Sequence, residues 1–241
     1  MRSSTKAWAV IVAAGRGDRF GAGEPKQFVA VAGRPLVLWT VDAFRKHPDI
    51  LGVSLVVPAD VAKQPPAWLA SLAAEGVSVV AGGVERTDSV RLGLTSVPAA
   101  ADVVAVHDGA RPLVTRQTIS RVLAAVEAGR GAIAARRASD SLKQVDGEGR
   151  VIRSLNREDV WRAETPQAFP RQLIQDIHRR AELDGVTASD CAGLCERYEV
   201  EVVVVESQQL NPKVTRPEDL EWVELWIRRT LTPSPPPSQR D

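Results

Sequence analysis

Short apolar runs alternate along the chain with longer segments that have the periodicity of amphipathic helices. Several runs are apolar at every position, which is typical of strands covered on both faces of a sheet. Strands that alternate with helices are typical of βαβ units. The pattern predicts an α/β fold with a mostly parallel twisted sheet and helices on both faces. The predicted strands are 8–13, 51–57, 77–80, 103–106, 132–135 and 200–205.

The segment 116–128 has the clearest helical pattern. Thr115 can cap its first turn, and Gly129 can end it. Its apolar residues recur at helical spacing, so they form a buried stripe at Ile119, Val122, Leu123 and Val126. The other predicted helices are 35–44, 66–74, 88–97, 171–183, 189–197 and 217–231.

One stretch, at about 138–161, breaks this alternation. Two short strands, 141–145 and 150–155, flank the turn Asp146-Gly147-Glu148-Gly149, which has the composition of a hairpin turn. An isolated hairpin is marginally stable in water. We therefore expect this protruding β-hairpin arm to lean on the body of the chain or on a second subunit.

The length and charge of the chain limit the number of domains and the kinds of partner to expect. A chain of 241 residues can bury a sizeable core; we expect a single domain over 1–231 and a disordered proline-rich tail over 232–241. Lys and Arg total 31 against 30 for Asp and Glu, so no overall field favours nucleic acid or a membrane. Because neither a membrane span nor a signal peptide is recognisable, the cytoplasm is the expected location.

The two cysteines, Cys191 and Cys195, are four residues apart and would share one face of a helix. A metal site would need further thiolates or imidazoles close by, whereas the histidines are distant in sequence. The spacing favours two reduced, half-buried thiols over structural zinc.

The segment 13–27 combines glycines, two arginines and a lysine directly after an apolar run. Glycines let backbone N–H groups approach an anion, while Arg16, Arg19 and Lys26 supply positive charge. The segment lacks the Gly-Lys pair of a Walker A loop, and its glycines do not have the G-x-G-x-x-G spacing of dinucleotide-binding proteins. It predicts a cradle for a nucleoside triphosphate, or else a strand-to-helix turn whose glycines serve geometry alone.

Two further segments follow predicted strands. In 82–90, backbone amides with Arg86 and Ser89 could grip a base or ribose, or Asp88 or Ser89 could only cap a helix. Asp108 ends the strand 103–106, at the edge where open α/β sheets bind ligands. Its carboxylate could hold a divalent ion against phosphates, or pair with Arg111. We interpret the neighbouring histidine as structural.

The last two segments are polar. The segment 164–169 is predicted to be a turn that could line a pocket. The segment 211–220 precedes a helix with Pro217 and two acidic residues in its first turn, which leaves Lys213 free to point toward a substrate.

Together these segments resemble the 2-C-methyl-D-erythritol 4-phosphate cytidylyltransferases of the non-mevalonate isoprenoid pathway, over about 7–227. The resemblance rests on A-A-G-R-G-D-R-F with P-K-Q (13–20, 25–27), G-G-V-E-R-T-D-S-V (82–90), H-D-G-A-R-P (107–112), D-S-L-K (140–143), T-P-Q-A-F (165–169) and K-V-T-R-P-E-D-L (213–220). It implies a Rossmann-like nucleotidyltransferase fold, a homodimer clasped by the hairpin arm, and a Mg²⁺-dependent reaction of CTP with methylerythritol phosphate that releases pyrophosphate.

The resemblance also implies a role for each matching residue. Arg19 and Lys26 would bind the triphosphate and stabilise charge on the α-phosphate, and Lys213 would hold the sugar phosphate beside it, with Arg157 from the partner's arm. Asp108 would lie by the metal and the nucleotide. The other implied nucleotide-binding residues are Ala13, Ala14, Gly15, Gly17, Gly82, Arg86 and Ser89. The other implied substrate-binding residues are Asp140, Ser141 and Thr165.

This sequence departs from the family pattern at a few positions. Ser141 stands where threonine is usual and keeps a hydroxyl, and Ala13 replaces a frequent proline. Ser189 stands where many members have a second acidic residue before Asp190, so substrate contacts could differ there. Two alternatives remain: a related enzyme that makes CDP-ribitol from ribitol 5-phosphate, and a catalytically silent nucleotide-binding domain. The retained cationic residues count against the silent domain.

Overall fold

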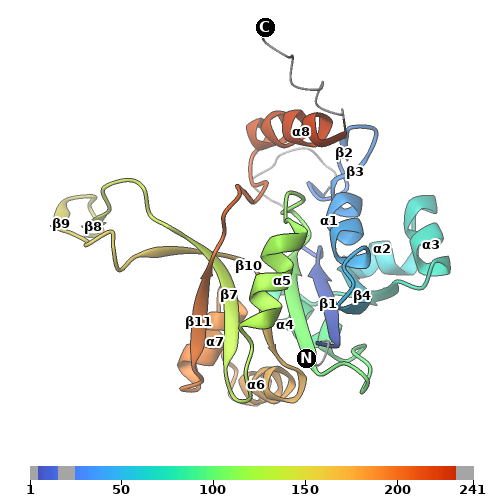
Figure 1. Ribbon diagram of the computed structural model, residues 1–241, viewed down its shortest axis with the longest axis horizontal. Helices are drawn as coiled ribbons and strands as arrows, with labels where there is room; N and C mark the ends of the chain where they lie inside the picture. The colour runs from blue at the N-terminus through green and yellow to red at the C-terminus, as the bar shows by residue number, and fades with distance from the viewer. Residues whose placement is uncertain (1–4, 16–24, 232–241) are drawn as a thin grey trace, which may run out of the picture.

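The computed structural model describes residues 5–15 and 25–231. Within them, seven strands form one sheet in the order β11-β7-β10-β6-β1-β4-β5 (Figure 1). All neighbouring strands are parallel except the two pairs that involve β10, so the predicted mostly parallel sheet is confirmed. The strand bounds are β1 (Ala7–Val12), β4 (Ile50–Val57), β5 (Ser78–Ala81), β6 (Val103–Asp108), β7 (Gly131–Arg137), β10 (Trp161–Pro170) and β11 (Val202–Glu206).

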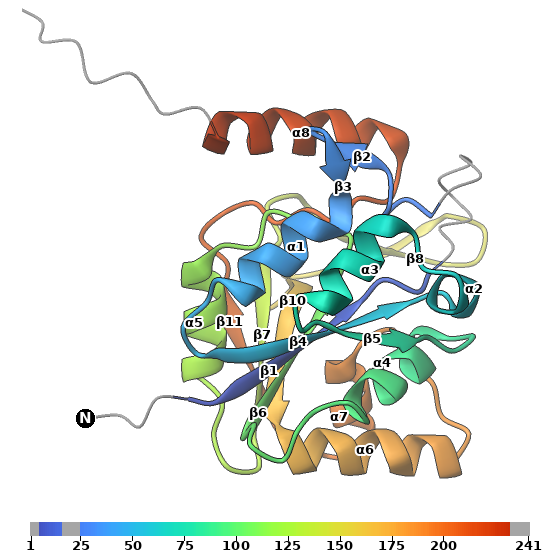
Figure 2. The ribbon, with the colours of Figure 1, turned by 90° about the vertical axis from the view of Figure 1, so that its right-hand side faces the viewer.

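Helices cover both faces of the sheet (Figure 2). One face is packed by α1 (Leu36–Arg45), α3 (Ala67–Ala74) and α5 (Arg116–Ala124). The other is packed by α4 (Arg86–Leu94), α6 (Arg171–Leu183) and α7 (Cys191–Arg197). The remaining described elements are α2 (Ala59–Lys63), α8 (Pro217–Leu231), and the short strands β2 (Ala30–Val31) and β3 (Arg34–Pro35).

Fully buried apolar side chains fasten the helices to the sheet. Phe44, Leu69 and Ile119 anchor α1, α3 and α5 on one face, while Ile174 and Leu194 anchor α6 and α7 on the other. Each such side chain contributes about 1.5–3 kcal/mol through burial. This double layer holds the sheet edge rigid where the polar site lies.

The predicted helix at 116–128 begins as expected. The Thr115 hydroxyl accepts a hydrogen bond from the Thr118 amide at 3.1 Å, which caps α5. The helix ends at Ala124, earlier than predicted, because a tight turn joins Glu127 to Arg130 before β7. Gly129 lies in that turn with a positive φ of 80°, which glycine adopts readily.

The prediction of a turn at 164–169 is wrong. This segment lies within β10, which runs antiparallel between β6 and β7 near the centre of the sheet. Its residues are buried although several are polar. The hydrophobic pattern could not reveal this strand, because several of its buried side chains are polar.

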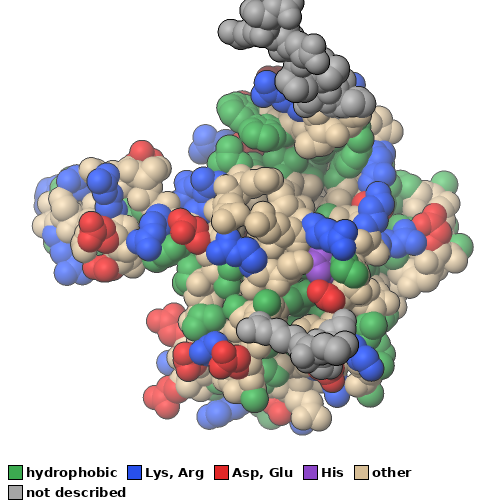
Figure 3. All heavy atoms as spheres, viewed as in Figure 1, with side chains coloured by type: hydrophobic (Ala, Val, Ile, Leu, Met, Phe, Trp, Pro, Cys, Tyr) green, Lys and Arg blue, Asp and Glu red, His purple; other side chains and the backbone are tan. Residues whose placement is uncertain are grey.

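The predicted hairpin is confirmed. β8 (Lys143–Val145) pairs antiparallel with β9 (Val151–Ser154), and Figure 1 shows the pair projecting away from the body. The Asp146 carboxylate closes the turn by accepting hydrogen bonds from two backbone amides, both at 2.9 Å. Side chains of both charges cover the arm (Figure 3).

Both cysteines lie on the buried face of α7 as free thiols. Burial raises the pKa of Cys191 to about 11 and that of Cys195 to about 12, so both thiols stay protonated at neutral pH. Among the described residues, no cluster of three or more His, Cys, Asp or Glu side chains could hold a metal ion. No described helix has the length and apolar character that crossing a membrane requires.

Candidate active site

Asp108 ends β6 at the carboxyl edge of the sheet, where parallel strands present their last side chains to a ligand. Every residue of β6 is buried, so the position of Asp108 is fixed by the core. Thr165 on β10 reinforces it, because its hydroxyl accepts a hydrogen bond from the Asp108 amide at 3.1 Å.

Three cationic side chains surround the Asp108 carboxylate. Arg86 donates to Oδ1 at 3.1 Å, Lys213 lies 2.9 Å from Oδ2, and Arg111 lies 3.6 Å from Oδ2. Burial alone would raise the pKa of Asp108, but these positive charges outweigh burial and hold the pKa well below its usual range. The carboxylate therefore gathers residues from α4, β6 and the segment before α8 around one point.

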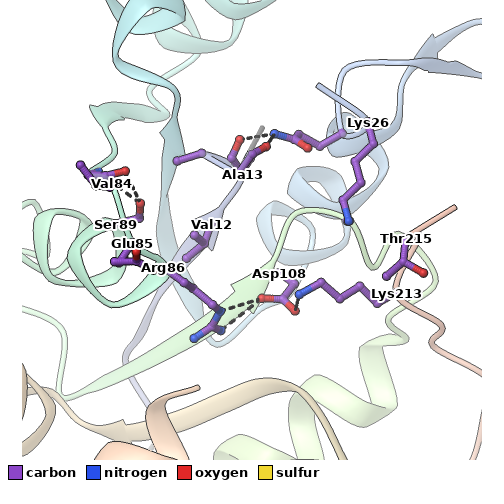
Figure 4. Close-up of a pocket in the computed structure, with 15 residues that line it drawn as sticks. Val12, Ala13, Lys26, Val84, Glu85, Arg86, Ser89, Asp108, Lys213 and Thr215 are labelled. Atoms are coloured by element: carbon purple, nitrogen blue, oxygen red, sulfur yellow. Dashed lines mark hydrogen bonds and ion pairs between the residues drawn. The ribbon is translucent and has the colours of Figure 1, made fainter. Parts of the chain in front are cut away.

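A cavity of about 440 Å³ opens beside this cluster. Lys26 and Lys213 enter it from different parts of the chain, and Figure 4 shows both side chains directed toward Asp108. The structure thus brings together two of the predicted catalytic lysines. The predicted site residues that line the cavity are Ala13, Ala14, Gly15, Lys26, Arg86, Ser89, Asp108 and Lys213.

Gln27 fixes the wall that carries Lys26. Its buried side-chain amide donates to the carbonyls of Ala13 at 2.5 Å and Gly15 at 2.8 Å, which ties the segment that begins at Pro25 to the end of β1. Gln27 stands in the P-K-Q motif, but the motif alone does not reveal this role. Gly17 and Arg19, predicted in this turn, lie outside the described residues.

The loop between β5 and α4 forms the opposite wall. A Cβ at Gly82 would lie 2.3 Å from the Ala14 side chain, so glycine is needed for close packing there. Gly83 lines the cavity, and its amide donates to the buried Ser89 hydroxyl at 3.2 Å. Asp88 accepts from the Glu85 amide at 3.1 Å and so supports the helix start. The loop thus combines the packing and capping roles with a surface open to a ligand.

A second cleft, of about 230 Å³, lies on the other side of the Asp108 cluster. Arg86, Asp108 and Lys213 line both spaces, so these three side chains form the boundary between them. Arg111 and the predicted substrate residue Thr165 also line the cleft.

Asp190 and Gln167 build the far wall of this cleft. Asp190 caps α7 by accepting from the Gly193 amide at 2.9 Å, and its other oxygen accepts from the Gln167 side chain at 2.8 Å. Gln167 in turn accepts from the Cys191 amide at 3.0 Å. Asp190 is the acidic residue retained from the family pattern, whereas the Gln167 contacts depend on the fold and have no signal in the sequence. Ser189 lines the cleft beside them.

Three predicted residues lie elsewhere. Asp140, Ser141 and Arg157 are exposed on the arm, and none of them lines the cavity or the cleft of this chain. Figure 1 shows the arm extending away from the carboxyl edge of the sheet. The described part of one chain therefore brings only some of the predicted site residues to the cavity and the cleft.

His107 supports the site from behind. It is fully buried against the ring of Phe44, and its Nε2 lies 3.1 Å from the Arg111 carbonyl oxygen. Burial lowers the pKa of His107 to about 4, so the ring is neutral at physiological pH. This environment agrees with the structural role interpreted from the sequence.

A mostly parallel sheet with a cationic cavity at its carboxyl edge, adjoined by a second polar cleft, defines an enzyme of the nucleotidyltransferase class. The family model described as 2-C-methyl-D-erythritol 4-phosphate cytidylyltransferase (IspD) matches residues 7–229. The chain belongs to this family, and the resemblance found in the sequence is confirmed.

Individual relatives agree with this assignment. The chain is 36% identical to a 2-C-methyl-D-erythritol 4-phosphate cytidylyltransferase of Syntrophus aciditrophicus, over 93% of this chain and 97% of the relative. It is 40% identical to a bifunctional enzyme IspD/IspF of Desulfotalea psychrophila, of which it spans 57%. The crystal structure of the cytidylyltransferase from Thermus thermophilus superposes with a TM-score of 0.74 at 33% identity, covering 91% of this chain and 98% of that one.

Proposed function

We propose that this enzyme joins CTP to 2-C-methyl-D-erythritol 4-phosphate, giving 4-diphosphocytidyl-2-C-methylerythritol and pyrophosphate in isoprenoid precursor biosynthesis. The observation that supports it most is the pair of adjoining pockets that share Arg86, Asp108 and Lys213. The larger cavity is assigned to CTP and the smaller cleft to the acceptor. The shared boundary is then the place where the two phosphates meet.

The chemistry suits this arrangement. An oxygen of the acceptor phosphate attacks the α-phosphorus of CTP, a new P–O bond forms, and the bond to pyrophosphate breaks. Both reactants are anions, so positioning and charge neutralisation carry the catalysis and no covalent enzyme intermediate is required. Lys26 and Lys213 reach this point from different walls, and Arg19 joins them in the proposed catalytic set.

Lys213 has a second partner available during the reaction. Its ammonium group contacts Asp108 at 2.9 Å, and its side chain is 38% exposed. When the acceptor phosphate arrives, Lys213 can exchange this carboxylate for a phosphate oxygen, while Arg86 and Arg111 keep Asp108 paired. Asp108 thus holds the Lys213 side chain in position before the substrate binds.

The proposed nucleotide contacts divide between two walls. Ala13, Ala14, Gly15 and Gly17 hold the triphosphate, and the loop that begins at Gly82 holds the cytosine and ribose with Arg86 and Ser89.

We assign the divalent cation to Asp108, the carboxylate at the boundary. Mg²⁺ prefers one or two carboxylates together with substrate phosphate oxygens. Asp108 is one carboxylate that lines both spaces, so it would hold Mg²⁺ together with the triphosphate. When bound, the ion would neutralise phosphate charge.

The arm completes the site in our proposal. Asp140, Ser141 and Arg157 are exposed in one chain, so a homodimer would let the arm of one protomer deliver them to the cleft of its partner. A cytoplasmic location agrees with CTP as a substrate.

A coupled pyrophosphate assay tests the function. The enzyme is given CTP and Mg²⁺ with methylerythritol phosphate or ribitol 5-phosphate in parallel, and omission of each component serves as the control. We expect pyrophosphate release only with CTP, Mg²⁺ and methylerythritol phosphate together. Equal or faster turnover of ribitol phosphate would refute the acceptor assignment, and no turnover of either would refute the enzyme assignment.

A further inference from the structure

Asn211 is a buried residue that the proposed reaction does not use, two positions before Lys213. It is only 3% exposed, although asparagine usually lies at the surface of a protein. The segment that carries it joins β11 to α8 and is neither helix nor strand. Because such a segment has no regular ladder of backbone hydrogen bonds, other bonds must fix its position.

Asn211 supplies two of these bonds. Its side-chain amide donates to the Thr165 carbonyl on β10 at 2.9 Å. Its own backbone carbonyl accepts from the Arg111 guanidinium at 2.7 Å. One residue therefore fastens the irregular segment both to the strand that lines the acceptor cleft and to the loop after β6.

Lys213 lies between this attachment and a second one. The next residue, Val214, is fully buried, and its amide donates to the Ala110 carbonyl at 2.9 Å. The backbone is thus held on both sides of Lys213, while the lysine side chain extends from it to the Asp108 carboxylate. The position of the ammonium group depends on where these two attachments place the backbone.

The bonds of Asn211 also close a circuit through the Asp108 cluster. The Thr165 hydroxyl accepts from the Asp108 amide, and the Thr165 carbonyl accepts from Asn211. Arg111 completes the circuit, because it donates to Asn211 and lies 3.6 Å from the Asp108 carboxylate. Buried polar networks of this kind rigidify a site. The circuit fixes the Lys213 segment relative to both Asp108 and Thr165.

We propose that Asn211 is a positioning residue, which holds the backbone of Lys213 where the ammonium group reaches the acceptor phosphate. The inference rests on the proposed function, in which Lys213 exchanges Asp108 for that phosphate. Once the carboxylate contact is exchanged, the reach of the flexible lysine side chain is set by its backbone. A displacement of about 1 Å can then lower the rate by about a hundredfold.

Steady-state kinetics of Asn211→Leu test this role, because leucine has the same branched shape without the amide donor. We expect kcat to fall by about tenfold or more. The KM for CTP should stay within about twofold, since the walls of the CTP cavity at Gln27 and Gly82 are unaltered. Asn211→Asp also removes the donor and should lower kcat as well.

Gln208→Leu is the matched control. Gln208 is an exposed amide of the same connecting segment, and it lines neither the cavity nor the cleft. We expect its kcat to stay within about twofold of the unaltered enzyme. An unchanged kcat in Asn211→Leu and Asn211→Asp would overturn the proposal, as would an equal loss in Gln208→Leu.

A double variant separates positioning of Lys213 from general support of the fold. A residue that acts through Lys213 has nothing left to position once that side chain is removed. Asn211→Leu should therefore lower the residual rate of Lys213→Ala by less than about twofold, although it lowers the rate of the unaltered enzyme by about tenfold. A tenfold loss in both backgrounds would overturn the proposal.

Amide hydrogen exchange tests the attachment without any turnover. In the enzyme without substrates, we expect the Val214 amide to exchange at least about tenfold faster in Asn211→Leu than in Gln208→Leu, because the segment opens more often. Unchanged protection of Val214 would overturn the inference. If the unaltered enzyme turned over no acceptor, the proposed function itself would fail, whereas the exchange rates would still show whether Asn211 holds the segment.

Discussion

The sheet-edge site and the hairpin arm hold their functional residues in opposite ways. At the sheet edge, Asp108 is buried and contacted by three cations, and each wall of the cavity is tied down by hydrogen bonds. On the arm, Arg157 is exposed on a two-stranded hairpin that projects from the body. The sheet edge is preorganised by one chain, whereas the arm has the features of a structure that is completed by a partner.

The two parts of the site therefore acquire their geometry from different sources. The core of the chain positions Lys26, Lys213 and Arg86 before any ligand arrives. A two-stranded hairpin lacks a core of its own, so dimer formation would have to fix the positions of the arm residues. Variants in the two regions should therefore respond differently to protein concentration and to mixing with other variants.

Removal of either lysine of the cavity should have the largest effect. We expect Lys26→Ala and Lys213→Ala each to lower turnover by at least about a hundredfold, because each removes a charge that the proposed mechanism places against the transition state. Steady-state rates with CTP and methylerythritol phosphate measure this, with Lys63→Ala in α2 as the control. Near-normal rates in both cavity variants would contradict the assigned roles.

Mixing two impaired variants tests whether the arm acts across a dimer. We expect Arg157→Ala to lower turnover by about tenfold or more, since a charged contact to phosphate is lost. If the arm serves its partner, an equimolar mixture with Lys213→Ala should recover about a quarter of normal activity, because half of the dimers then hold one intact site.

The control for the mixing experiment is the pair Lys26→Ala and Lys213→Ala. Both residues line the same cavity of one chain, so this mixture should recover no activity. No recovery with Arg157→Ala would mean that the arm acts within its own chain. Recovery in the control would instead contradict the placement of both lysines in one cavity of a single chain.

Replacing the apolar side chains of the arm should weaken dimer formation and should lower activity less than the changes above. Val151 and Ile152 are 62% and 58% exposed in the single chain, which suits residues that a partner covers. We expect Val151→Ser with Ile152→Ser to shift sedimentation toward monomer and to lower activity a few-fold at dilute protein, with recovery at high concentration. Unchanged sedimentation would show that these side chains do not contribute to an interface.

The smallest expected effect is on the pH dependence of stability, which should differ between variants at the sheet edge and variants on the arm. The lowered pKa of Asp108 means that its charge stabilises the fold above the unfolded pKa of about 3.9, and that this contribution is lost as the pH falls through the folded value. Denaturant unfolding should show Asp108→Asn less stable than the unaltered enzyme at neutral pH, with the difference shrinking below about pH 4. Asp140→Asn on the arm should change little at any pH, and a matching response would contradict the contrast.

The sequence predicted the parts of the molecule that depend on local pattern. Apolar runs located β1, β4, β5, β6, β7 and β11, and the turn at Asp146 located the arm. Asp108 was found because it directly follows an apolar strand, and Lys213 because it precedes a helix start.

The parts that the sequence did not predict depend on contacts between distant segments. β10 is polar along much of its length, and its place between β6 and β7 comes from the sheet. Gln27 and Gln167 act through bonds to backbone groups elsewhere in the chain, for which no spacing rule exists.

The pairing of Trp161 with Arg137 makes the whole arm an enlarged connection within one antiparallel hairpin. The guanidinium of Arg137 stacks 4.4 Å above the Trp161 ring and closes the root of that connection. The chain leaves the sheet at the end of β7 and returns to it at the start of β10, and these two points are paired. The length of the arm is therefore independent of the register between β7 and β10. Such a layout lets insertions, deletions or exchange of the arm between homologues change the arm while the folding of the catalytic body is preserved.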